Sequence, residues 1–172
     1  MNEKVRIKWN TDKLGELYPP FRDKIAAIVI ELESLGFRPR IQEAWRSQAD
    51  QLKAFNSGNS QLKFGFHNVT GANGAKESLA VDMVDDDLVN KKKTTYERAE
   101  YLLRLTAAAQ RHGLTTGIGW GLEDFPKAVE AIGIAITNGD WKASLKRFGW
   151  DPEHIQPKDI TPEEARSGKR PL

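Results

Sequence analysis

One six-residue segment, residues 79–84, constrains the fold of this chain more than any other part of its sequence. It reads Leu-Ala-Val-Asp-Met-Val, so an extended strand here is apolar on both faces except at Asp82. Such a run predicts a buried strand. Burying an ionised carboxylate is costly unless a cation or hydrogen bonds meet it. Asp82 therefore either caps or salt-bridges the strand end, or belongs to a functional site.

The composition supports a core around this strand and excludes several classes of protein. The chain has 172 residues, of which 39% are hydrophobic, enough for one domain with a real core. Its 26 Lys and Arg residues and 24 Asp and Glu residues give a net charge of +2. That balance excludes a strongly basic nucleic-acid arm and an acidic disordered tail. The absence of cysteine excludes disulfide scaffolds, cysteine zinc fingers and thiol catalysis.

The sequence shows neither a membrane-spanning pattern nor an export signal. It contains no run of 18 apolar residues. Residues 1–9 are charged and short of apolar side chains, unlike a signal peptide. We therefore expect the chain to be made in the cytosol and not to be exported through a cleaved signal.

Hydrophobic periodicity and turn residues indicate a small α+β domain with short strands. Helices are expected at residues 20–35, 48–55 and 95–111. Strands are expected at residues 37–45, 79–84 and 114–120, and from about residue 154. Residues 128–136 fit either a helix or a strand. Thr161 to Glu164 forms a capping-box pattern for a short helix.

Two histidines combine with Asp82 into a candidate metal site. His67 lies beside Phe66 in an aromatic stretch, a place more typical of a packed core histidine. His154 follows Asp151-Pro152, a pair that also suits the start of a helix. Taken together, two neutral imidazoles and one carboxylate are a normal ligand set for catalytic zinc, with water in the fourth position.

Neighbouring charged residues extend this hypothesis to a catalytic site. Asp151 lies three residues before His154, so it can sit beside the fourth position as a general base, and Glu153 is the rival base. Arg46 ends a short predicted strand. It can face the same cleft and bind an anionic substrate group or a developing oxyanion.

Other candidates have ordinary structural interpretations. The three acids at residues 85–87 are rival ligands to Asp82, but an exposed, solvated turn is the expected role. His112 ends a predicted helix, where the helix dipole favours a histidine. Trp120 either lines the substrate groove or packs in the core. Trp141 and Trp150 are expected to be packing residues.

Four motifs occur in a fixed order over residues 14–157. They are Trp45-Arg46-Ser47 with Gln51, Gly65-Phe66-His67-Asn68 with Ala80-Val81-Asp82, Trp120-Gly121 with Gly139-Asp140-Trp141-Lys142, and Asp151-Pro152-Glu153-His154. In this order they resemble the LAS-type zinc peptidases. That family includes the VanY-like D-alanyl-D-alanine carboxypeptidases and the phage L-alanyl-D-glutamate endopeptidases.

The resemblance implies a fold and a set of site residues. The fold is a small antiparallel sheet with helices packed on it, as in the Hedgehog and DD-peptidase zinc proteins, over residues 1–157. A polar, solvated C-terminal extension follows over residues 158–172. The implied Zn²⁺ ligands are His67, Asp82 and His154. The implied catalytic residues are Asp151 and Arg46, and the implied substrate-binding residues are Arg46, Gln51 and Trp120.

The implied function is endolysin-like hydrolysis of a bacterial peptidoglycan peptide bond that involves a D-amino acid, the L-alanyl-D-glutamate bond first. A monomer that waits in the cytosol and then acts on the wall is expected, because the export signal of a periplasmic carboxypeptidase is missing. The alternatives are a D-alanyl-D-alanine carboxypeptidase or dipeptidase, and a non-catalytic peptidoglycan-binding or virion domain of the same fold.

The sequence also departs from the family pattern. Gly65 stands where the family usually has serine. Residues 69–78 and 122–138 are insertions that flank the predicted site. We expect these insertions to form a substrate lid or a groove wall.

Overall fold

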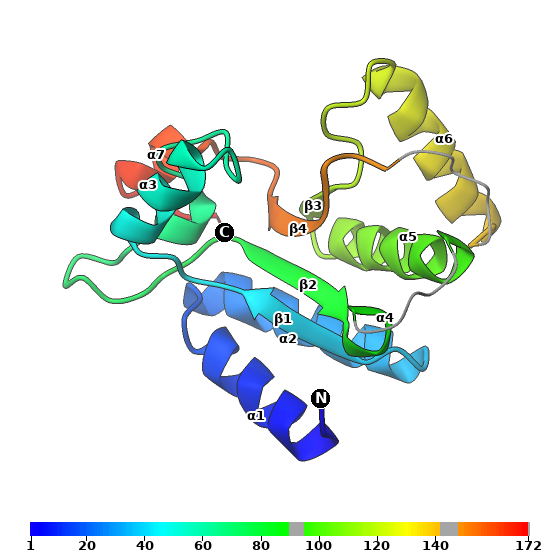
Figure 1. Ribbon diagram of the computed structural model, residues 1–172, viewed down its shortest axis with the longest axis horizontal. Helices are drawn as coiled ribbons and strands as arrows, with labels where there is room; N and C mark the ends of the chain where they lie inside the picture. Colours follow the sequence, from blue (N-terminus) through cyan, green and yellow to red (C-terminus); the bar gives the residue numbers. More distant parts are fainter. Residues whose placement is uncertain (90–94, 142–147, 172) are drawn as a thin grey trace.

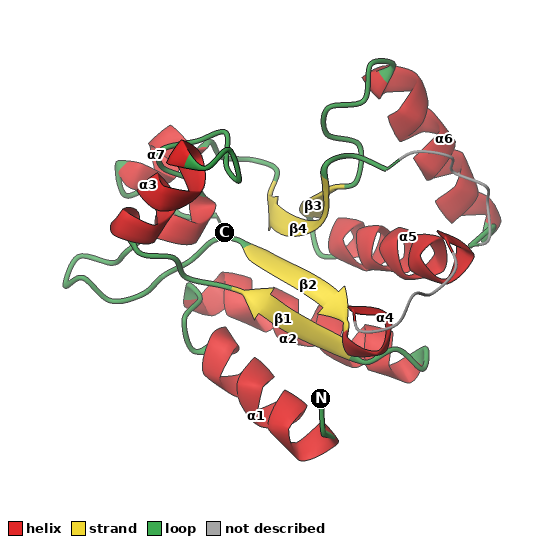
Figure 2. Cartoon of the chain, in the orientation of Figure 1, coloured by secondary structure: helices red, strands yellow, loops and turns green. Residues whose placement is uncertain are grey.

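A four-stranded antiparallel sheet forms the centre of the protein (Figure 1 and Figure 2). The computed structural model describes residues 1–89, 95–141 and 148–171, and within them the strand order is β1-β2-β4-β3. The bounds are Pro39–Glu43 (β1), Val81–Asp85 (β2), Leu114–Gly117 (β3) and Asp151–Pro157 (β4). Each neighbouring pair runs antiparallel. The predicted α+β class and antiparallel sheet are therefore confirmed.

Helices surround this sheet. Within the described residues they are α1 (Glu3–Leu14), α2 (Pro19–Ser34), α3 (Gln48–Asn56), α4 (Asp86–Val89), α5 (Thr95–Arg111), α6 (Phe125–Asn138) and α7 (Pro162–Arg166), with a 3-10 turn η1 (Phe66–Asn68). The three predicted helices are confirmed as α2, α3 and α5. The ambiguous residues 128–136 belong to helix α6. No helix in the described ranges is long and apolar enough to cross a membrane.

The core lies where α2 and α5 pack against the sheet. Helix α2, which lies behind β1 and β2 in Figure 1, buries Ile25, Ile28 and Leu32 completely. These side chains join Val81 of β2 and Ile155 of β4 in one apolar cluster. Each fully buried side chain of this kind contributes about 1.5–3 kcal/mol relative to an exposed one. The two central strands are thus anchored in the core.

Helix α1 is not predicted by the apolar pattern, because its inward face is polar. Its buried residues are Arg6 and Asn10. Asn10 accepts a hydrogen bond from the Ile41 N–H (3.0 Å) and donates one to the Pro39 carbonyl (2.9 Å), to which Arg6 also donates (2.6 Å). Trp9 donates to the Ile41 carbonyl (2.6 Å). Helix α1 therefore satisfies backbone groups of the edge strand β1, which protects that edge from pairing with another chain.

The acidic cluster that closes β2 is not the exposed turn that the sequence predicts. Asp85 and Asp86 are only 6% and 3% exposed. Asp86 accepts a hydrogen bond from Arg40 Nε (2.8 Å), and Asp87 accepts one from Arg38 Nη1 (2.6 Å). The prediction is wrong because these arginines lie 46 and 49 residues away in the sequence. Asp86 and Asp87 thus form ion pairs, and Asp85 accepts a hydrogen bond from the Asp87 N–H (3.0 Å), so the cluster is held by protein contacts.

Most described residues of the C-terminal segment are exposed, but a few of them anchor it to the rest of the protein. Ile160 and Ala165 are buried members of the apolar core, and α7 begins at the predicted capping box. Arg170 donates to Glu77 (2.9 Å) and to the Thr70 carbonyl (2.8 Å). The expectation of a solvated extension over residues 158–172 is therefore wrong for these positions, because their contacts are with segments distant in the sequence.

Candidate metal centre

Three segments far apart in the sequence bring the predicted metal ligands together. Asp82 of β2 and His154 of β4 are direct partners in the antiparallel register. His67 lies in η1, which is tied to the end of β1 by a hydrogen bond from the Arg46 N–H to the His67 carbonyl (2.9 Å). Both histidines are 7% exposed. Backbone hydrogen bonds thus fix where each candidate ligand residue lies relative to the other two.

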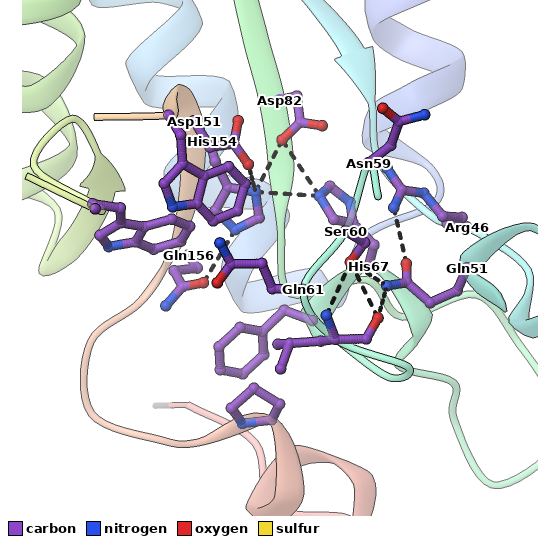
Figure 3. A pocket seen from close by; sticks show the side chains of 17 residues that line it. Arg46, Gln51, Asn59, Ser60, Gln61, His67, Asp82, Asp151, His154 and Gln156 are labelled. Carbon is purple, nitrogen blue, oxygen red and sulfur yellow. Dashed lines mark hydrogen bonds and ion pairs between the residues drawn. The ribbon is translucent and has the colours of Figure 1, made fainter. Parts of the chain in front are cut away.

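The three side chains converge on one point (Figure 3). His154 Nδ1 lies 2.9 Å from Asp82 Oδ1, and His67 Nε2 lies 3.4 Å from the same oxygen. The two imidazole nitrogens are 3.3 Å apart. Each residue offers one atom that can bind a metal, and these three ligand atoms lie within 4.8 Å of one another. This spacing lets a single metal ion contact all three residues.

In each imidazole, the nitrogen that points away from Asp82 has a hydrogen-bond partner of its own. His67 Nδ1 lies 2.5 Å from the Ala44 carbonyl oxygen, and His154 Nε2 lies 3.1 Å from Gln156 Oε1. A carbonyl oxygen can only accept, so these nitrogens carry the protons of neutral rings. With a metal ion bound, His67 Nε2 and His154 Nδ1 would turn their lone pairs to the ion beside the Asp82 carboxylate. A protonated imidazole would instead donate from the same nitrogen to Asp82 Oδ1. The three converging ligand atoms fit a bound cation, and ligand histidines are commonly oriented in this way.

The charges in the group reinforce one another. Burial alone would raise the pKa of the Asp82 carboxyl, but His67 and His154 outweigh it and hold that pKa far below its usual range. Burial likewise opposes protonation of His67, yet the Asp82 charge raises the pKa of its imidazole. The carboxylate therefore stays ionised, which is the state that a metal ligand requires.

Asp151 lies beside this group. Its Oδ2 is 3.8 Å from His154 Nδ1. Residues three apart in a regular strand face opposite sides, but the β3–β4 register shifts between Thr116 and Gly117, and this irregularity returns Asp151 to the His154 side. Burial, and then the negative charge of Asp82, raise the pKa of the Asp151 carboxyl to about 6. The alternative in which Asp151-Pro152 starts a helix is wrong, since both belong to β4.

The rival base Glu153 has a different role. Its Oε1 accepts a hydrogen bond from Arg98 Nη2 (2.8 Å). This ion pair joins β4 to helix α5. Of the two acids before His154, the geometry thus favours Asp151 as the residue that serves the site.

Arg46 is held by two other side chains. Glu43 accepts from Arg46 Nε (2.7 Å) and also from Nη2, and Gln51 Oε1 accepts from Nη1 (2.9 Å). The hydrogen bonds that Arg46 donates to Glu43 raise the pKa of the Arg46 guanidinium despite its partial burial. Gln51 in turn donates to Ser60 Oγ (2.8 Å) and the Leu62 carbonyl (2.6 Å). Sequence reasoning missed Glu43, whose only signal is its place three residues before Arg46.

All seven predicted site residues line one cavity of about 600 Å³. They are Arg46, Gln51, His67, Asp82, Trp120, Asp151 and His154. Its walls also include residues 59–62, Gly65, Phe66, Gly121, Trp150, Gln156 and Pro162. Sequence reasoning found no functional signal in residues 59–62, because their side chains are ordinary loop residues. Gln61, Gln156 and His154 all belong to the lining of this cavity (Figure 3).

Neither insertion forms the expected lid. Among the described residues that line the cavity, none comes from 69–78 or 122–138. Residues 69–78 fold back on themselves through a bridge between Thr70 and Lys76. Residues 125–138 form α6, which buries Ile132 and Ala135. The expectation is wrong because residues 69–78 contact Glu16 and Arg170, and α6 packs against α5, so neither insertion covers the site.

The tryptophans divide into two groups. Trp141 packs against the core and under the Arg104 guanidinium (4.4 Å to the ring centroid), as predicted. Trp150, predicted to pack, is instead 51% exposed and lines the cavity. Trp120 contacts both His154 and the exposed Trp150. The centroid of its ring lies 5.2 Å from that of His154 and 5.6 Å from that of Trp150.

The remaining predicted features lie apart from the group. His112 follows the end of α5, as expected, and is not among the residues that line the cavity. Gly139 ends α6 in the left-handed conformation, and Lys142 of the same motif lies outside the described residues.

Comparisons with known proteins leave the chain without an assigned family. No protein-family model matches the sequence, and no curated protein matches it. The buried group of His67, Asp82 and His154 nevertheless has the spacing and chemistry to hold a metal ion.

Proposed function

We propose that this protein is a zinc peptidase of the bacterial cell wall that hydrolyses the L-alanyl-D-glutamate bond of peptidoglycan peptide stems. The observation that carries the proposal is the convergence of three candidate ligand atoms beside the half-buried Asp151 carboxylate in one cavity. Two imidazoles and one carboxylate, with a fourth position left for water, are the ligand set of catalytic rather than structural zinc. The order of the four motifs supports the family and, through it, the wall substrate.

His67, Asp82 and His154 would hold the ion. Bound zinc supplies Lewis-acid polarisation of a carbonyl and lowers the pKa of a water molecule to about 7. Imidazole and carboxylate ligands suit zinc well, whereas calcium and magnesium prefer oxygen ligands alone. The orienting bonds from Ala44 and Gln156 fix both rings for this task.

Asp151 moves the proton. Its carboxylate lies 3.8 Å from His154 Nδ1, close enough to the ligand group to accept a hydrogen bond from a water molecule that would be held there. Asp151 accepts one proton from the attacking water as the water oxygen bonds to the scissile carbonyl carbon. The same proton then goes to the departing nitrogen as the C–N bond breaks, which leaves a carboxylic acid and an amine. The acid gives up its remaining proton, the second of the water, so the products at neutral pH are a carboxylate and an ammonium group.

Arg46 acts on the carbonyl oxygen. Its guanidinium lines the same cavity, and Glu43 and Gln51 hold it in one orientation before substrate arrives. A donor fixed in advance stabilises the negative charge that develops on the oxygen without reorganising. Removing one such donor typically lowers the rate by about 10²- to 10³-fold.

The test combines zinc content with wall hydrolysis. Wild type should hold about one zinc per chain and release new amine ends from purified walls. The H154A variant should lose both properties. H112A removes the histidine outside the cavity and should keep both, so it is the matched control.

Mass spectrometry of the products identifies the bond. New D-glutamate amino termini support the proposal. Released D-alanine would replace it with a carboxypeptidase, and wild-type protein that neither binds zinc nor cuts walls would overturn it.

A further inference from the structure

The cavity has an aromatic wall to which the proposed reaction gives no role. Trp150 lines the cavity yet is 51% exposed. Large exposed aromatic side chains beside a site are typical of ligand contact, because burial of the ring by a ligand is favourable. Trp120, which is also in the lining, connects this ring to the metal centre.

The exposed ring is held in place by its surroundings. It lies 5.6 Å from the Trp120 ring, and the Trp120 ring lies 5.2 Å from that of His154. A Cβ built on Gly121 would lie 2.8 Å from Cδ1 of the Trp150 ring. A Cβ built on Gly149 would lie 2.4 Å from the backbone nitrogen of Trp120. Glycine at both positions lets the backbone approach the two tryptophans closely. A continuous row of rings therefore leads from the metal centre to the surface.

The two sides of the cavity differ in chemistry. Figure 3 places Arg46 and Gln51 on the His67 side of the group and Asp151 on the His154 side. The indole row begins at His154. A substrate that crosses the centre therefore meets a guanidinium at one end and aromatic faces at the other.

We infer that Trp150, together with Trp120, binds the amino sugar that carries the peptide stem. This inference rests on the proposed function. On the amine side of the scissile bond the substrate carries the acidic D-glutamate, which matches the Arg46 side. On the acyl side, alanine is joined through a lactyl group to the sugar, whose C–H face matches an indole face.

Chain lengths agree with this assignment. One alanine and one lactyl group separate the scissile carbonyl from the sugar, about 7 Å when extended. Trp150 lies two ring-to-ring steps, of 5.2 and 5.6 Å, from the His154 imidazole. In a D-alanyl-D-alanine stem, four residues and the lactyl group separate the scissile carbonyl from the sugar, about 17 Å when extended. The aromatic wall therefore fits hydrolysis close to the glycan strand better than hydrolysis at the stem's far end.

The test compares two zinc-loaded reactions on peptides that differ at one end. One peptide carries an N-acetylmuramoyl group on its L-alanyl-D-glutamyl sequence, and the other carries an acetyl group. Wild type should cut the muramoyl peptide with about tenfold higher kcat/KM, the size of one aromatic contact. The ratio of kcat/KM for the muramoyl peptide to kcat/KM for the acetyl peptide should fall to about one in W150A. The same ratio should stay near the wild-type value in W150F.

A matched control excludes a general effect of surface change. I134A removes a side chain of α6 that is 54% exposed and does not line the cavity, so its ratio should equal that of wild type. A wild-type ratio near one, or an unchanged ratio in W150A, would overturn the inference.

Direct binding separates this inference from the proposed function. If wild type cuts neither peptide, the proposed function fails. Saturation-transfer NMR with N-acetylmuramic acid then tests separately whether the two tryptophans bind the sugar. Transfer to the sugar protons that W150A abolishes supports the aromatic subsite. Absence of transfer to wild type overturns it.

Discussion

Two buried polar clusters lie at different places on the same sheet, and they differ in how their hydrogen bonds are matched. The edge cluster consists of Arg6 and Asn10 of α1 with the backbone of Pro39 and Ile41 in β1. In it, side-chain donors meet carbonyl acceptors and the Asn10 oxygen meets a backbone N–H. The candidate metal centre consists of His67, Asp82 and His154, and its converging atoms are two imidazole nitrogens and one carboxylate oxygen, which can all bind one cation.

This difference separates a structural cluster from a functional one. Buried polar groups are normally paired, because an unpaired one costs about 1–3 kcal/mol. The edge cluster meets that rule with protein atoms alone. In the candidate metal centre, the Asp82 carboxylate can be paired either with a bound cation or with a proton on an imidazole, so the same atoms can exchange one partner for the other. Changes in the edge cluster should therefore lower stability, whereas changes at the metal centre should lower activity or metal affinity.

Asp151→Asn should have the largest effect, on activity alone. Loss of a general base typically lowers the rate by about 10²- to 10⁴-fold, and we expect about 10³-fold in kcat for wall peptides. The substituted amide has the shape of the carboxylate, so zinc content should match wild type. The Tm of metal-free protein should be unchanged or higher, because folding partly buries this carboxylate beside Asp82 at a cost.

Zinc titration, calorimetry and peptide hydrolysis measure these three properties. Glu153→Gln is the control, since Glu153 pairs with Arg98. Equal activities of Asp151→Asn and wild type would remove Asp151 from the mechanism.

Arg6→Met should have the opposite profile. Arg6 is 2% exposed and donates to Glu3, Glu33 and the Pro39 carbonyl. Hydrogen bonds to charged groups contribute about 1.5–3 kcal/mol each, and both carboxylate partners are partly exposed, so the free energy of unfolding should fall by about 2–3 kcal/mol. The folded fraction should keep wild-type zinc content and kcat.

Urea unfolding with activity measured below the transition checks this prediction. Lys8→Met is the control, because Lys8 forms an exposed pair with Asp12 on the same helix. We expect that variant to lie within about 1 kcal/mol of wild type. A loss of kcat in folded Arg6→Met would show that the edge cluster also supports the site.

Added zinc should stabilise wild type through the metal centre only. A ligand that binds the folded state, present at about 100 times its Kd, raises the free energy of unfolding by about 2.7 kcal/mol. Asp82→Asn should lose most of this increment. Asn10→Ala should start from a lower stability and gain the full increment. Thermal unfolding with and without zinc measures both, and an equal gain in Asp82→Asn would place the ion elsewhere.

The sequence predicts the residues of the metal centre better than their surroundings. His67, Asp82, Asp151 and His154 carry recognisable chemistry at recognisable spacing, so a local pattern points to them. The structure brings them together through the β2–β4 register and the irregular β3–β4 pairing. Neither the register nor the irregularity leaves a mark in the local sequence.

Contacts between distant segments account for what the sequence did not predict. Helix α1 lacks an apolar stripe because its inward residues bond to the backbone of β1. The acids at residues 85–87 look solvated in sequence until Arg38 and Arg40 are placed beside them. Trp150 is indistinguishable from a core tryptophan in sequence, and only the fold shows that its ring is exposed.

Glu43→Gln should have the smallest effect and tests whether the metal centre extends beyond its ligands. The register of β1 and β2 pairs Glu43 with Asp82, and a bulge between Ile41 and Glu43 marks this position. The substituted amide keeps one acceptor oxygen but lacks the charge that holds the Arg46 guanidinium. We expect kcat to fall about tenfold with little change in KM, because a positioning residue acts mainly in the transition state.

A purely structural role for Glu43 would lower the Tm and leave kcat of the folded protein intact. Steady-state kinetics, Tm and zinc content therefore distinguish the two roles. Glu43→Asp should recover part of kcat, since it restores the charge at a shorter reach. If Glu43→Gln and Glu153→Gln have the same kcat, the functional cluster ends at Arg46, and the charge on Arg46 needs no partner to act on substrate.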